Sequence, residues 1–90
     1  MPPVSHPFLK GRLICYINYN DHSPPHIHVK YQQDVSNYRI NIKTREWLKS
    51  GKVLPNKLKK LIEAWVGAHE VDLLRQWDNA KNNIPVKVIG

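Results

Sequence analysis

Cysteine is almost absent from the sequence, since Cys15 is the only one in 90 residues. An intramolecular disulfide and a zinc site built from several cysteines are therefore excluded. Cys15 lies in an apolar run, where a thiol packs as a small hydrophobic group, and we expect a reducing compartment. Apolar runs are also short, and none approaches the roughly 20 residues that a membrane-spanning helix needs. The first residues have neither the basic nor the apolar region of a signal peptide, so we expect a cytoplasmic protein without a membrane partner.

Acidic residues are scarce as well. The chain has 7 Asp and Glu against 14 Lys and Arg, and its formal net charge is +7. The imbalance belongs to residues 1–60, which carry eleven basic and three acidic residues, whereas residues 61–90 carry three and four. Such a charge predicts attraction to a polyanion, either a nucleic acid or an acidic protein. The hydrophobic fraction of 41% is typical of a globular chain, and the length suits a single domain over residues 1–90.

Hydrophobic periodicity predicts strands first and helices second. Residues 1–9 are rich in proline and predict an extended arm, and alternating apolar residues predict strands over 12–19, 26–32 and 37–44. Pro55 predicts a helix start, Gly67 an interruption, and residues 70–81 a second helix that Pro85 follows. Residues 86–89 suit a short terminal strand. We expect an α+β fold: a small antiparallel sheet of three to four strands with two helices packed on one face.

The most unusual stretch is residues 21–29, Asp-His-Ser-Pro-Pro-His-Ile-His-Val, which holds three of the five histidines. Pro24 and Pro25 predict a loop, because a proline pair cannot donate ladder hydrogen bonds. His26 and His28 then lie on one side of a strand, about 6.6 Å apart at ~3.3 Å per residue. We expect this side to be solvated and to display Lys30, Arg39 and Lys43 without an acidic residue.

The run from Tyr19 to His28, which reads Tyr-Asn-Asp-His-Ser-Pro-Pro-His-Ile-His, resembles the motif of small bacterial proteins grouped as domain-of-unknown-function family 4160. The resemblance extends from about Phe8 to Pro85. It includes a Leu-Pro pair before the first helix and a helical Trp/His/Leu pattern, here Leu54-Pro55, Trp65, His69, Leu73, Leu74 and Trp77. The chain departs from the family where Gln32-Gln33-Asp34 replace the usual glycines, which bears on the hairpin geometry and not on the histidines.

The resemblance implies a short cytoplasmic protein that is often encoded beside a small partner, in what looks like a toxin–antitoxin arrangement. It implies no established reaction. We therefore expect the toxin-like member of such a pair, with RNA and a small acidic antitoxin-like protein as partners.

The residues themselves suggest a metal-independent ribonuclease. RNA cleavage needs one group to take the 2′-hydroxyl proton and another to protonate the leaving oxygen, and imidazole does either near neutral pH. Our candidate catalytic residues are His26 and His28, with His22 and with Asp21 as an orienting carboxylate. The nearby cations would neutralise phosphate charge, and further lysines would add affinity without specificity. The predicted nucleic-acid-binding residues are Lys30, Arg39, Lys43, Lys57 and Lys60.

Two other interpretations remain open at this point. His26 and His28 with His22, Asp21 or His69 have the residue types of a zinc site in a regulatory domain, although the surrounding cations oppose a divalent ion. Alternatively, the histidines only shape the fold, and the basic face of a non-catalytic interaction module docks an acidic protein. We predict neither a bound metal nor another cofactor, and whether the protein is an enzyme stays open.

Overall fold

The computed structural model describes residues 3–5, 13–19, 22–31, 38–49 and 54–89. These residues form four strands followed by two helices. The strands are β1 (Leu13–Tyr16), β2 (His26–Tyr31), β3 (Tyr38–Asn41) and β4 (Trp47–Lys49), and the helices are α1 (Asn56–Ala68) and α2 (Glu70–Lys81). The predicted α+β fold is confirmed. The predicted turn after β2 and the departure from the family's glycines both lie outside the described residues.

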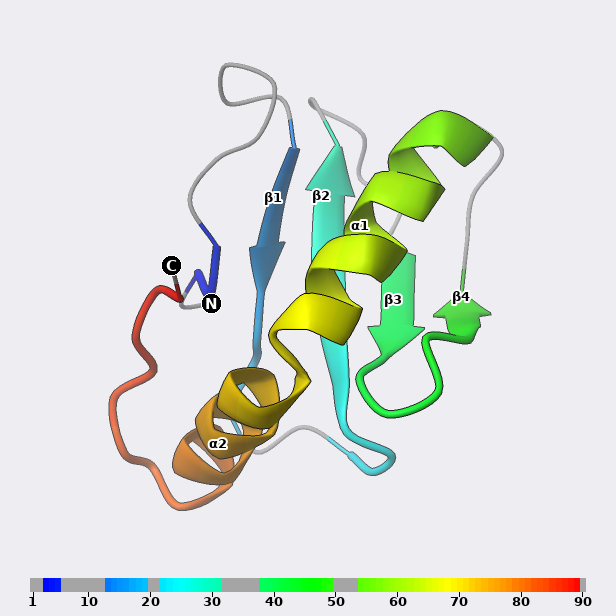
Figure 1. The fold of residues 1–90 in the computed structure, drawn as a ribbon. Coiled ribbons are helices and arrows are strands. Elements are labelled where there is room, and N and C mark those ends of the chain that lie inside the picture. The colour runs from blue at the N-terminus through cyan, green and yellow to red at the C-terminus, as the bar shows by residue number, and fades with distance from the viewer. Residues whose placement is uncertain (1–2, 6–12, 20–21, 32–37, 50–53, 90) are drawn as a thin grey trace.

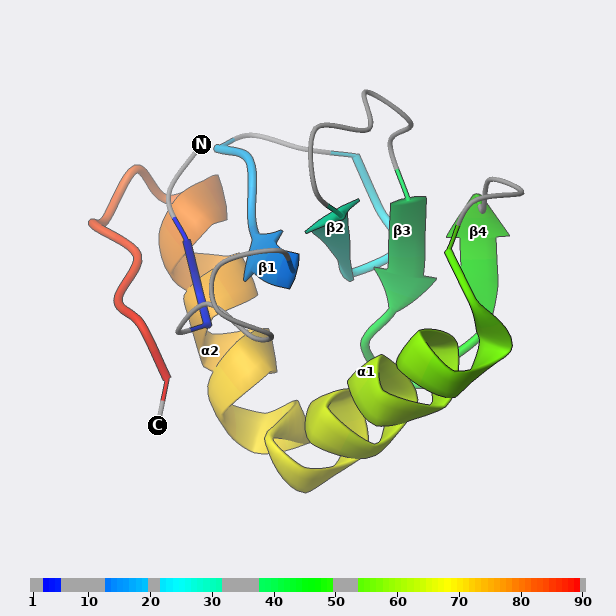
Figure 2. The same ribbon diagram turned by 90° about the horizontal axis from the view of Figure 1, so that it is seen from above.

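The four strands form one antiparallel sheet in the order β1-β2-β3-β4, so each strand pairs with its neighbour in the chain (Figure 1). The register places Cys15 opposite Val29 and Ile27 opposite Ile40. Because side chains alternate along a strand, these residues share one face of the sheet. Figure 2 shows α1 running along one face of the sheet and α2 lying beside β1 at the edge of the sheet.

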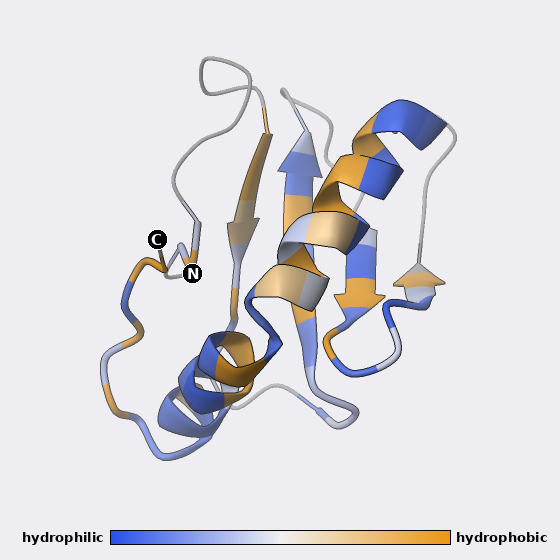
Figure 3. Cartoon of the chain, in the orientation of Figure 1, coloured by the Kyte–Doolittle hydropathy of each residue, from blue (hydrophilic) through white to orange (hydrophobic). Residues whose placement is uncertain are grey.

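The core lies between the apolar face of the sheet and the helices. Fully buried strand residues pack with Ile62 and Val66 of α1 and with Leu73 of α2. Figure 3 shows the matching pattern, in which β1 is apolar along its length and the first turn of α1 is hydrophilic. Ile62 and Val66 are the buried residues of α1, and they form the side of this helix that covers the sheet. No described helix is long and apolar enough to span a bilayer.

The break between the helices differs from the expectation. Gly67 lies inside α1, and the chain turns at His69, whose φ of −118° leaves the helical region. The backbone N–H of His69 still donates to the carbonyls of Trp65 and Val66. Glycine is tolerated inside a helix at a cost of about 1 kcal/mol relative to alanine, so its presence alone does not end one.

Backbone segments from both ends of the chain extend the sheet beyond β1. The N–H of Val4 donates to the carbonyl of Cys15 at 2.9 Å, and the N–H of Ile89 donates to the carbonyl of Val4 at 2.9 Å. Residues 3–5 therefore lie between β1 and residue 89. The expected terminal strand is reduced to this single bridge at Ile89, and the arm predicted for residues 1–9 is part of the sheet where it is described.

Candidate functional site

His26 and His28 lie on the side of the sheet opposite the main core, as their alternation predicts. The register pairs His28 with Tyr16 of β1 and with Arg39 of β3, and it pairs His26 with Asn41. Both histidines are only 3% exposed. The expectation that they look outward onto a solvated face is therefore wrong. The position of α2 gives a physical reason, because this helix runs past the carboxyl end of β1 and brings Trp77 to His26 (Figures 1 and 2).

The ring of His26 contacts the histidine loop, the neighbouring histidine and the second helix. Its Nδ1 lies 2.7 Å from the carbonyl oxygen of Pro24, so Nδ1 carries a proton and donates it. Its ring centroid lies 5.1 Å from that of Trp77 and 5.0 Å from that of His28, the latter in an edge-to-face arrangement. Pro25 follows Pro24 and restricts its ψ to the extended region, so the carbonyl of Pro24 meets the ring in a restricted geometry. His26 thus joins the histidine loop to the second helix.

The ring of His28 stacks on Tyr16, with centroids 5.2 Å apart and planes inclined by 10°. Its Nε2 lies 3.2 Å from Nδ2 of Asn18. Nδ2 of an amide can only donate, so Nε2 of His28 is the acceptor in this contact. Burial raises the pKa of Tyr16 above its usual value of 10.0, so its phenol stays protonated at neutral pH. The ring of His28 is thus held between the phenol ring of Tyr16 and the amide of Asn18.

The rings of Tyr16, His26, His28 and Trp77 form one cluster. Two buried polar atoms next to this cluster, Oδ1 of Asn18 and Nε of Arg39, have no hydrogen-bond partner in the described part of the chain. Both residues adjoin His28, one through its ring nitrogen and the other through the strand register. A buried polar group without a partner costs about 1–3 kcal/mol. The cluster is therefore not optimised for stability alone.

The remaining candidate catalytic residues are less well placed. His22 is exposed in the loop before β2, and Asp21 lies outside the described residues. His69 packs by its ring against Trp65, at 5.2 Å between centroids, on the helical side of the molecule. No group of three or more His, Cys, Asp or Glu side chains comes together among the residues that the structure describes. The structure thus brings His26 and His28 together, without His69.

The candidate RNA-binding cations fall into two groups. Lys30 and Arg39 are on the histidine side of the sheet, Lys30 exposed and Arg39 half-buried, and Lys43 is exposed in the turn after β3. Lys57 and Lys60 are exposed on α1, which covers the other face. One short stretch of RNA cannot lie along both groups. The predicted RNA-binding cations therefore lie on two opposite sides of the sheet and do not form one surface.

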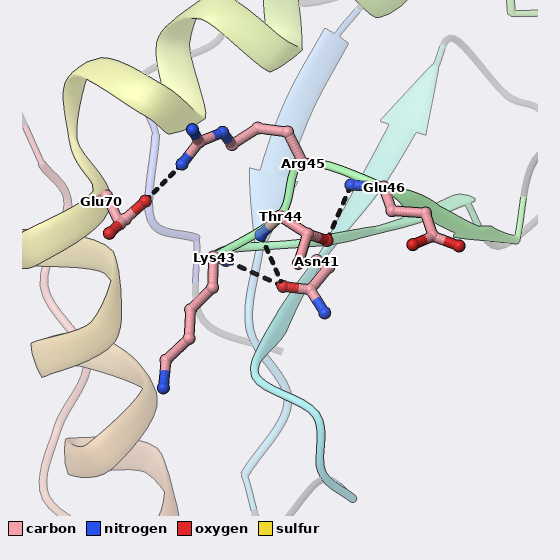
Figure 4. Close-up of polar contacts among 6 residues, drawn as sticks. All are labelled: Asn41, Lys43, Thr44, Arg45, Glu46 and Glu70. Carbon is pink, nitrogen blue, oxygen red and sulfur yellow. Dashed lines mark hydrogen bonds and ion pairs between the residues drawn. The ribbon is translucent and has the colours of Figure 1, made fainter.

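The turn after β3 is held by side-chain hydrogen bonds (Figure 4). Oδ1 of Asn41 accepts from the backbone N–H groups of Lys43 at 2.8 Å and Thr44 at 3.0 Å. Arg45 has a left-handed φ of 61°, which is unfavourable for a residue other than glycine. Its backbone N–H donates to the carbonyl of Asn41, and its guanidinium pairs with Glu70 of α2. These bonds hold the backbone of Lys43 beside the end of β3.

Cys15 takes no part in this cluster, since it faces the core. Burial raises the pKa of its thiol to about 12, and a hydrogen bond with Ser5 acts in the opposite direction. A thiol with so high a pKa is neither a nucleophile nor a metal ligand at neutral pH. The expectation that Cys15 packs as an apolar group is confirmed.

Three contributors to the cluster were missed from the sequence as site residues. Tyr16 is the last residue of β1 and Asn18 lies two positions further along, and the two-residue period places both on the side of His28. The two-residue period of β1 was therefore a sufficient signal for both residues. Trp77 was assigned to the core from its helical spacing, and nothing in the sequence indicated that it also reaches His26.

The family model described as "Domain of unknown function (DUF4160)" matches residues 12–78, and the chain belongs to this family. The match includes all four strands, α1 and most of α2. No curated protein and no solved structure matches the chain.

Proposed function

We propose that the protein binds RNA through the histidine side of its sheet, as the toxin-like member of a two-gene pair that acts in the cytoplasm. The observation that supports this most is the composition of the sheet. None of the four described strands contains an acidic residue, whereas Lys30, Arg39 and Lys49 are basic. A surface with one sign of charge attracts the phosphates of a nucleic acid.

The register adds a spatial argument. Tyr16 pairs with His28, His28 with Arg39, and Arg39 with Lys49, so one row of residues crosses all four strands. Strands spaced at about 4.8 Å make this row roughly 14 Å long. An extended single-stranded RNA that lay along this row would pass the backbone positions of Arg39 and Lys49, and the exposed Lys30 would lie beside it. Phosphate contacts of this kind provide affinity without base specificity.

Cleavage is the second candidate function. The separation of 5.0 Å between the rings of His26 and His28 favours it, because a general acid and a general base must flank one phosphate. At 3% exposure neither ring can touch RNA, so cleavage requires that the contact of His26 with Trp77 opens. His22 and Asp21 would then act from the adjoining loop. Binding needs no such movement, and it is the function that this geometry supports best.

The test is the affinity for a fluorescently labelled single-stranded RNA, measured by anisotropy over a series of salt concentrations. Each lost phosphate contact should lower the salt slope by about 0.7 for a single strand. We expect this change for Lys30→Gln and Arg39→Gln, but not for Lys81→Gln, an exposed lysine at the end of α2. Equal affinity of all three variants, or an affinity that salt does not change, would contradict the proposal.

The same variants separate binding from cleavage in cells. Growth arrest on induced expression, with cellular RNA intact, supports occlusion of RNA. RNA that is cut in cells and by the purified protein, but not by His28→Asn, supports catalysis. Growth that continues normally with well-expressed, folded protein would contradict the toxin-like role.

A further inference from the structure

Arg39 has a cationic side chain that the described part of the fold leaves unpaired. This side chain is half-buried on the histidine side of the sheet, and its Nε is buried without a hydrogen-bond partner among the described residues. Two other arginines do have carboxylate partners, since Arg45 pairs with Glu70 and Arg75 pairs with Asp72. A charged group that is partly removed from water normally has a counter-ion. The state of Arg39 therefore points to an anion that comes from outside the chain.

The pairing of β3 with β4 places a second cationic residue opposite Arg39. Ile40 pairs with Trp47, so a regular antiparallel register would bring Leu48 opposite Arg39. The register shifts at this point, and Lys49 takes that position instead. Like charges directly opposite each other on two strands are destabilising, and β-bulges are over-represented next to functional sites. The irregularity thus brings two cationic positions together where an apolar residue would otherwise pair with Arg39.

A third cation lies on the same side of the sheet. Lys30 is exposed, two residues beyond His28 on the strand that pairs with β3. The described acidic residue nearest to Arg39 in the register is Glu46, whose backbone carbonyl accepts from the N–H of Asn41. Glu46 is exposed, and it forms no ion pair with Arg39. The three cationic positions, which we call the anion site, are Lys30, Arg39 and Lys49.

The backbone holds Arg39 in a fixed place. β3 is an inner strand with a neighbour on each side. The residues before and after Arg39, Tyr38 and Ile40, are both fully buried in the core. A guanidinium on such a support loses little freedom when it binds a ligand. Its planar set of N–H donors matches two oxygens of a phosphate or a carboxylate.

Charge selects among these anions. Cationic positions without a counter-charge favour a dianion, because the Coulomb energy rises in proportion to the charge of the ligand. A phosphate monoester carries about −1.5 to −2 at pH 7 and has three acceptor oxygens, whereas a carboxylate and an internal phosphodiester each carry a single charge. We propose that the anion site binds a terminal phosphate, with Arg39 as the residue that orients it. This group belongs to the end of an RNA strand or to a free nucleotide, and only the RNA source rests on the proposed function.

The first experiment uses small anions at constant ionic strength. The probes are methyl phosphate, a monoester, dimethyl phosphate, a diester, and acetate. Binding is followed on the arginine Nε–H signals and the backbone amides of β3 in proton–nitrogen correlation spectra of the whole protein. Arg39→Lys keeps the charge and removes the planar donors. Its matched control is Arg75→Lys, at an exposed arginine of α2, and the urea midpoint shows whether each variant is folded.

We expect methyl phosphate to shift the Arg39 Nε–H signal along a saturating curve, at a concentration about ten-fold lower than dimethyl phosphate or acetate needs. Arg39→Lys should weaken the binding of methyl phosphate about ten-fold, whereas Arg75→Lys should leave it unchanged. Three results would overturn the inference. They are no shift with methyl phosphate, equal binding of dimethyl phosphate or acetate, and unchanged affinity in folded Arg39→Lys.

The second experiment identifies the source of the phosphate. One labelled RNA sequence is compared with a phosphate at either end and with hydroxyls at both ends, and adenosine monophosphate is titrated separately. A phosphate at one end should tighten RNA binding about ten-fold, and Arg39→Lys should remove that difference. Binding of adenosine monophosphate without any preference for phosphorylated RNA indicates a nucleotide instead. Salt-dependent RNA binding without methyl phosphate binding would remove this inference and leave the proposed function intact, and the reverse result would do the opposite.

Discussion

Replacement of His26 by alanine tests how much the contacts of this side chain contribute to the free energy of unfolding. The substitution removes the donor to the carbonyl of Pro24 and two ring contacts, with His28 and with Trp77. A ring contact is worth about 0.5–1.5 kcal/mol beyond its buried area, and an intramolecular hydrogen bond contributes about 1 kcal/mol. We therefore expect a loss of about 2–4 kcal/mol in the free energy of unfolding, before any term for the cavity.

This loss is large for so small a protein. A chain of 90 residues has a total stability of roughly 5–13 kcal/mol. The melting temperature should fall by about 10–30 °C, at 4–8 °C per kcal/mol. His26→Phe provides the sharper comparison, because it keeps a ring against Trp77 but cannot donate to Pro24 or transfer a proton. It should lose only about 1–2 kcal/mol.

The measurement is urea unfolding followed by tryptophan fluorescence and far-UV circular dichroism. Lys81→Gln is the control, since Lys81 is exposed at the end of α2 and should change stability by less than about 0.5 kcal/mol. A loss below about 0.5 kcal/mol for His26→Ala would refute the packing argument. The series also serves the growth assay. Toxicity that His26→Phe retains and His26→Ala loses indicates a structural role, whereas loss in a stable His26→Phe indicates proton transfer.

Three other substitutions or conditions test the description of the core and the turn. The Cys15 thiol should react with a disulfide reagent at pH 8 only after unfolding. Because burial raises the pKa of this thiol from 9.0 to about 12, its contribution to the free energy of unfolding should be complete below pH 9 and should fall as the pH rises towards 12. Rapid labelling of the native protein would contradict this. Asn41→Ala removes the acceptor of two backbone N–H groups and should cost about 1–2 kcal/mol in urea unfolding, and no change would show that the turn holds without it. Glu70→Gln should cost less than about 1 kcal/mol, because both partners of the Arg45 pair are more than one-third exposed; a larger loss that salt does not reduce would contradict this.

The fold was predictable because its periods are clear. The alternation of Tyr38, Ile40 and Ile42 placed all three in the core, where they are fully buried. Pro55 marked the start of α1 correctly, and the second helix predicted for residues 70–81 matches α2. Local patterns of this kind depend on neighbouring residues alone, so they need no knowledge of the rest of the molecule.

The environment of the histidines was not predictable in the same way. Alternation states which side of the sheet His26 and His28 face, and that part was correct. It does not state what covers that side. The burial of His26 depends on Trp77, about 50 positions further along the chain, and on the direction in which α2 leaves His69, whereas His28 is covered by Tyr16 of the neighbouring strand. Long-range packing of this kind has no periodic trace in the sequence.

The placement of Val4 between the backbones of Cys15 and Ile89 has a consequence for shortened versions of the protein. Loss of residues 1–5 would leave the outer backbone groups of β1 without partners, and unpaired strand edges recruit strands from other molecules. Loss of residues 86–90 would instead uncover the carbonyl of Val4 and the side-chain oxygen of Gln76, which accepts from the backbone N–H of Lys87, and would remove the buried Ile89, but it would leave the edge of β1 paired. Trimming the two ends by similar lengths should therefore have unequal effects, with self-association expected after the first cut.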